Sequence, residues 1–126
     1  MKSLLIVTAI TELIAGVVLV TSPLTLVSIL TGIDVFDSAA VLTGRVAGFA
    51  LLSLSVACWL SRNEMKSALT LTRSMLVYNI GVTVILLNSA LTAHVSAIVL
   101  WPAVALHVML AGWSLIYILR FKMSLA

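Results

Sequence analysis

The chain has 126 residues, of which 63% are hydrophobic and 9% are charged, and its formal net charge is +3. With a mean hydropathy of +1.28, it carries more apolar surface than a soluble domain of this length can bury, which excludes a soluble globular protein and makes a lipid bilayer the expected surroundings. The basic residues form no single patch, so nucleic acid is not expected as a partner.

Four segments are apolar over the roughly 20 residues that a membrane-crossing helix needs. They cover residues 3–21, 38–60, 67–91 and 95–119. The sequence therefore predicts an all-α integral membrane protein, with four transmembrane helices in a compact bundle that forms a single domain over residues 1–126.

A short helix is predicted between the first two spans, at residues 23–31. Ser22 provides a cap, Pro23 takes the first helical position and Gly32 provides a stop. Weakly polar residues recur every third position within it, at Thr25, Ser28 and Thr31. This helix is too short to cross a bilayer and has the two-sided pattern of one that lies in the interface.

The positions of the basic residues predict the orientation. Those near the ends of the spans all flank the same side, at Lys2, Arg62, Lys66, Arg120 and Lys122, with Arg73 close to it. The opposite connections, 31–38 and 91–95, contain no lysine or arginine. By the positive-inside rule we expect a multi-pass protein of a bacterial inner membrane with both termini in the cytoplasm.

Each predicted span carries one strongly polar residue at membrane depth. These are Glu12, Arg45, Asn79 and His107, and ionisable groups at such depth are costly enough to indicate a function. Helical periodicity places each of them among small or weakly polar residues, the kind of face on which membrane helices pack, so we expect a polar cluster inside the bundle. Secondary candidates for the wall of a pocket are Thr8, Tyr78, Thr83 and Trp101.

The sequence leaves three roles open for this cluster. The first is structural: a buried ion pair between Glu12 and Arg45, supported by hydrogen bonds from Asn79 and His107. The second is a pocket for a small apolar or amphipathic ligand or a lipid, and the third is conduction of ions or protons. In each case we expect Arg45 to reach inward to Glu12, although it would meet the outer loop if it pointed outward.

Two further features carry expectations. Pro102 lies inside the predicted fourth span and should kink it, which would widen the outer half of the bundle above His107. The polar residues of the outer loops, Asp34, Asp37 and His94, match no metal-binding spacing. The chain also lacks the common catalytic signatures, so we expect neither a metal site nor an enzyme, and no cofactor is indicated.

Three stretches, "TELIAGVVLVTSPLTLVSILTG", "GRVAGFALLSLSVACWLSR" and "WPAVALHVMLAGW", resemble small bacterial four-helix inner-membrane proteins of the DoxX-like type. The resemblance covers most of the chain and implies the architecture rather than a chemistry. A looser kinship of that group to EXPERA-type membrane proteins implies an apolar ligand that meets an acid inside the membrane.

A second resemblance is to small multidrug-resistance transporters, which have four short helices and a glutamate midway along the first. It implies a homodimer that exchanges protons for cationic substrates. The one-sided charge bias and a cationic Arg45 beside Glu12 both argue against it. A third alternative is a non-catalytic accessory or immunity-type subunit that docks on a larger membrane partner.

Overall fold

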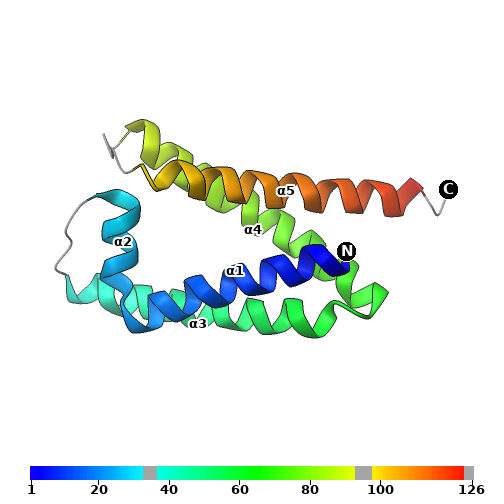
Figure 1. The fold of residues 1–126 in the computed structure, drawn as a ribbon, viewed down its shortest axis with the longest axis horizontal. Coiled ribbons are helices and arrows are strands. Elements are labelled where there is room, and N and C mark those ends of the chain that lie inside the picture. Colours follow the sequence, from blue (N-terminus) through cyan, green and yellow to red (C-terminus); the bar gives the residue numbers. More distant parts are fainter. Residues whose placement is uncertain (33–36, 93–97, 124–126) are drawn as a thin grey trace.

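The computed structural model describes residues 1–32, 37–92 and 98–123. In these ranges the chain forms five helices and no strand: α1 (Lys2–Thr21), α2 (Pro23–Thr31), α3 (Ser38–Ser61), α4 (Met65–Thr92) and α5 (Leu100–Met123) (Figure 1). All but α2 are long and apolar enough to cross a membrane. The all-α fold with four candidate spans is therefore confirmed, and it suggests a multi-pass membrane protein.

The ends of α2 and α3 follow the local signals. The short helix covers the predicted residues, with Pro23 in its first turn. It ends at Gly32, whose φ of 68° is a left-handed conformation that favours glycine, and the Gly32 N–H donates to the Ser28 carbonyl at 2.7 Å. Asp37 caps α3, because its side chain accepts a hydrogen bond from the Ala39 N–H at 3.1 Å.

The last helix differs from the prediction. It begins at Leu100 rather than at residue 95 and ends at Met123 rather than at 119, and residues 95–97 of the predicted span lie outside the described ranges. Pro102 is consequently the third residue of the helix. A proline in the first turn removes no intrahelical hydrogen bond, so the predicted kink of this span at Pro102 is wrong.

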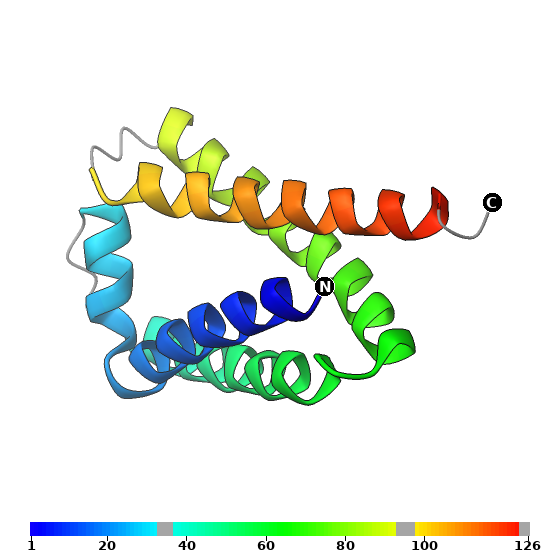
Figure 2. The ribbon, with the colours of Figure 1, turned by 45° about the vertical axis from the view of Figure 1, so that its right-hand side comes forward.

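The five helices are arranged as two antiparallel pairs, and α2 connects α1 to α3 within the first pair and packs against both. Helix α1 packs along α3, and α4 packs along α5, whereas contacts between the two pairs are sparse. Figures 1 and 2 show that the pairs lie close together near the N-terminus and separate toward the other end, where α2 stands across the space between them. The N-terminus and the end of α5 lie at the end of the molecule opposite α2 (Figure 1).

Helices α1 and α3 approach most closely at two glycines. A Cβ atom added to Gly16 would lie 2.9 Å from the Gly48 carbonyl oxygen, and one added to Gly48 would lie 2.9 Å from the Gly16 carbonyl oxygen. One turn away, a Cβ on Gly44 would lie 2.6 Å from the Cβ of Pro23. The Gly44-x-x-x-Gly48 spacing therefore admits both α1 and the start of α2 against α3.

A small apolar core joins the two pairs at their converging end. It consists of buried residues from α1, α3 and α4, namely Leu5, Ala9, Cys58, Ala68 and Met75. Large apolar side chains face outward elsewhere: Leu60 and Val77 are each 72% exposed. Such a surface is stable in lipid, where it needs no protein cover.

Candidate functional site

A cavity of about 420 Å³ lies between the two helix pairs, and all five helices contribute to its wall. The α2 helix contributes Leu26 and Leu30, so it covers the cavity at the end where the pairs separate. Of the described residues that line it, four are polar, Thr11, Glu12, Tyr78 and His107, and the others are apolar. Its size falls within the range of about 300–1,000 Å³ that is usual for small-molecule sites.

Glu12 is the central polar residue of this wall. Its side chain is 1% exposed, because it lies on the stripe of α1 that is buried in the bundle. The Tyr78 hydroxyl of α4 donates a hydrogen bond to Glu12 Oε2, with 3.2 Å between the oxygens. The second carboxylate oxygen, Oε1, is buried and has no hydrogen-bond partner. One of the two carboxylate oxygens is therefore without a partner.

His107 continues the polar cluster onto α5. Its Nδ1 lies 2.8 Å from Asn79 Oδ1, and the Asn79 amide nitrogen donates to the Met75 carbonyl at 2.7 Å. The His107 ring also meets Tyr78 edge to face, with 6.0 Å between the ring centroids. Asn79 is fully buried and lies behind the cavity wall, where it holds the His107 ring in place.

Three of the four predicted cluster residues, Glu12, Asn79 and His107, are thus brought together, with Tyr78 as the link between them. The predicted ion pair of Glu12 with Arg45 is wrong. Arg45 is exposed on α3, and Glu12 Oε1 is left without a partner. The buried stripe of α3 runs through Gly48 and Ser55, and one turn before Gly48 it reaches Gly44, from which Arg45 is rotated by about 100°.

The secondary candidates have different outcomes. Tyr78 lines the cavity. Thr8 is buried, and its hydroxyl has no hydrogen-bond partner, but it lies one turn from Glu12 and outside the cavity wall. The Thr83 hydroxyl donates to the Asn79 carbonyl at 2.7 Å, which uses its hydrogen within α4. Trp101 is 52% exposed at the start of α5 and does not line the cavity.

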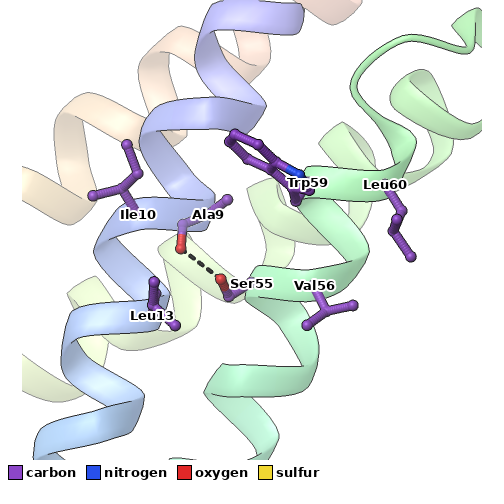
Figure 3. A pocket seen from close by; sticks show the side chains of 7 residues that line it. All are labelled: Ala9, Ile10, Leu13, Ser55, Val56, Trp59 and Leu60. Atoms are coloured by element: carbon purple, nitrogen blue, oxygen red, sulfur yellow. Dashed lines mark hydrogen bonds between the residues drawn. The ribbon is translucent and has the colours of Figure 1, made fainter.

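A second hollow, of about 480 Å³, lies on the outer side of the α1–α3 pair (Figure 3). Its wall is almost wholly apolar and includes Ile10, Leu13 and Trp59. The Ser55 hydroxyl in this wall donates to the Ala9 carbonyl at 2.7 Å, so its hydrogen is already used. This hollow offers surface for lipid chains, whereas the inner cavity is also lined by a residue with an unpaired polar atom, Glu12.

No protein-family model, curated protein or solved structure matches the chain. The similarity to DoxX-like proteins therefore stays a prediction. Of the predicted outer-loop residues, Asp34 and His94 lie outside the described ranges, and Asp37 is exposed at the start of α3. The function is argued below from the cavity and its polar groups.

Proposed function

We propose that the protein binds a small apolar or amphipathic ligand, or a lipid, in the cavity between its two helix pairs. The observation that supports the proposal is the state of Glu12: the residue lines an apolar cavity, and its Oε1 is buried without a hydrogen-bond partner. An unpartnered buried polar atom costs about 1–3 kcal/mol, and a charged one costs more. A ligand with a polar end would remove that cost, and its apolar part would fit the remaining wall.

A purely structural role explains the cluster less well. Interhelical hydrogen bonds in membrane proteins contribute only about 0.6 kcal/mol on average. Without Arg45, no cation among the described residues compensates the Glu12 carboxylate. An alanine or leucine at this position would therefore hold α1 in place at a lower cost, and a carboxylate is better explained by a binding role.

We further propose that the protein resides in a bacterial inner membrane with both termini in the cytoplasm. The N-terminus and the end of α5 lie at one end of the molecule (Figure 1). The basic residues of the last turn of α5, Arg120 and Lys122, lie at that end, as do Arg62 and Lys66, which flank the connection between α3 and α4. Positive charge at one end supports the cytoplasmic assignment of that end.

The binding proposal is tested by closing the cavity. Ala103 lines the cavity on α5, and Ala103→Phe places an aromatic ring in it. Ala105→Phe makes the same change two residues away at an exposed position and is the matched control. Each protein is purified from its native membrane in mild detergent, and co-purified small molecules are identified by mass spectrometry. We expect a compound that is enriched with the wild type and with Ala105→Phe, but absent from Ala103→Phe.

The same compounds in all three preparations, in the same proportions, would contradict the proposal. Both variants must be compared at equal helix content by circular dichroism, so that a misfolded protein is not mistaken for an empty cavity.

A proton-coupled transporter is the second candidate, and one observation favours it: Glu12 lacks the cationic partner that would compete with a cationic substrate, because Arg45 is exposed. In that case Glu12→Gln abolishes export of toxic lipophilic cations while the protein remains inserted. Cells without the protein that are no more sensitive to such cations would rule this candidate out.

A further inference from the structure

We infer that the cavity selects a ligand whose polar end is a hydrogen-bond donor, and that an aliphatic ammonium group is the end that fits it best. The inference rests on the proposed binding function and adds the chemical class of the ligand. It follows from the hydrogen bonds of the polar wall residues, because their N–H and O–H donors already have acceptors within the protein.

The two hydroxyl groups of the wall have no hydrogen to offer. The Thr11 hydroxyl donates to the Val7 carbonyl at 3.0 Å within α1. The Tyr78 hydroxyl donates to Glu12 Oε2 at 3.2 Å. Each hydroxyl carries a single hydrogen, so both can act toward a ligand only as acceptors.

The tautomer of His107 is fixed by Asn79. The Asn79 Nδ2 group donates to the Met75 carbonyl, which is an acceptor only, so the amide oxygen Oδ1 must be the atom that faces His107. Because Oδ1 is also an acceptor only, His107 Nδ1 carries the hydrogen of the 2.8 Å contact. In the neutral ring, Nε2 is then bare and accepts a hydrogen bond.

Among the described residues, Glu12 is the only acidic residue in the cavity wall. Its free oxygen, Oε1, is an acceptor when the side chain is ionised, and a cation on the ligand would supply the counter-charge that the described residues do not. The wall thus offers acceptors and one negative charge, set in apolar surroundings where such interactions are strong. With Glu12 ionised and His107 neutral, the described wall residues offer no donor to a carboxylate, phosphate or ketone, whereas an ammonium group supplies both hydrogens and charge.

Four probes with the same ten-carbon chain separate these contributions. Decylammonium has N–H donors and a positive charge, decyltrimethylammonium has the charge alone, decanol has one donor and no charge, and decanoate has the opposite charge. Binding of each probe is measured by equilibrium dialysis against the protein in lipid nanodiscs, with nanodiscs that hold Ala103→Phe as the reference for partition into lipid. Ala105→Phe serves again as the matched control.

We expect decylammonium to bind at least about tenfold more tightly than decanoate, the ratio that one charge-assisted hydrogen bond typically provides. Decyltrimethylammonium and decanol should lie between them. Glu12→Gln should reduce decylammonium binding about tenfold and change decanol binding by less than about threefold, because only the ammonium uses the charge.

Two failures are distinguishable. If no probe binds the wild type beyond the Ala103→Phe reference, the binding function itself fails. If the probes bind and Ala103→Phe prevents it, but decanoate or decanol binds as tightly as decylammonium, the ligand class is overturned and the binding function stands. Equal binding of decyltrimethylammonium and decylammonium also overturns the inference, since the N–H donors would then be irrelevant.

Discussion

Tyr78 of α4 donates a hydrogen bond to Glu12 of α1, with 3.2 Å between the two oxygens. The two residues belong to different helix pairs, and those pairs share few other contacts. The bond therefore has two consequences: it links the pairs beside the cavity, and it leaves one Glu12 oxygen for a ligand.

Tyr78→Phe should destabilise the protein. The change leaves both Glu12 oxygens without a partner, and we expect the free energy of unfolding to fall by about 1–3 kcal/mol. Tyr117→Phe is the matched control, because Tyr117 stacks on Trp113 near the other end of α5 and lies outside the cavity wall. Equilibrium unfolding in detergent measures both; equal stability of the two variants would show that the Glu12–Tyr78 bond contributes nothing.

Gly16→Ala and Gly48→Ala should each separate α1 from α3. The new methyl group would lie 2.9 Å from a backbone oxygen of the facing helix, which cannot move without the whole helix, so we expect a loss of about 1–3 kcal/mol. Gly112→Ala in α5 meets nothing within 4 Å. It should stabilise its helix by about 0.5–1 kcal/mol. Thermal unfolding of the three variants should give opposite signs, and a loss for Gly112→Ala would contradict the packing described here.

Arg45 and Glu12 should behave independently. Because Arg45 is exposed, Arg45→Ala is expected to change the free energy of unfolding by no more than about 0.5 kcal/mol. In a double-mutant cycle with Glu12→Gln, the two effects should add within about 0.5 kcal/mol. A coupling energy of several kcal/mol would show that Arg45 and Glu12 interact, as an ion pair would.

Glu64, in the turn between α3 and α4, should respond to Ser67. Hydrogen bonds from the Ser67 hydroxyl and backbone N–H hold the pKa of Glu64 below its ordinary value. Its contribution to stability is therefore present above the unfolded-state pKa of about 4.3 and is lost as the pH falls through the lower folded-state pKa. Ser67→Ala should raise the pKa of Glu64, whereas Ser74→Ala should not, as carbon NMR of labelled glutamate would show.

The orientation can be tested by reporter fusions. A fusion after Gly32, at the end of α2, should report the extracytoplasmic side, and a fusion after Ala126 should report the cytoplasm. A cytoplasmic signal from the Gly32 fusion would reverse the orientation.

Much of the fold could be predicted because its signals are local. Ser22-Pro23 and Gly32 bracket α2 through caps and backbone conformation, and these depend on few neighbours. The start of α5 could not be predicted in this way, since apolar residues run without a break from Ile98 into the helix. Hydropathy measures tolerance for lipid, and it does not distinguish a turn from a helix in a continuous apolar run.

The candidate site could be predicted for those residues whose burial depends only on the helix face on which they lie. Glu12 belongs to the buried stripe of α1, and Asn79 and His107 likewise face inward. Arg45 was assigned to the wrong face because it lies about 60° from Gly48, near enough for a small residue to share the stripe but too far for a long one to turn inward. The importance of Tyr78 depends on its length, which lets a residue about 100° from Asn79 still reach Glu12.

The central claim is that a ligand's polar end meets Glu12, and the most direct test follows from the chain having only two glutamates, Glu12 and Glu64. With the glutamate carboxyl carbons isotopically labelled, each gives one NMR signal, and Glu64 lies outside the cavity. Titration with decylammonium should shift the Glu12 signal saturably and leave the Glu64 signal in place. In Ala103→Phe neither signal should move. Saturable binding by dialysis with no change in the Glu12 signal, or with equal changes in both signals, would contradict it.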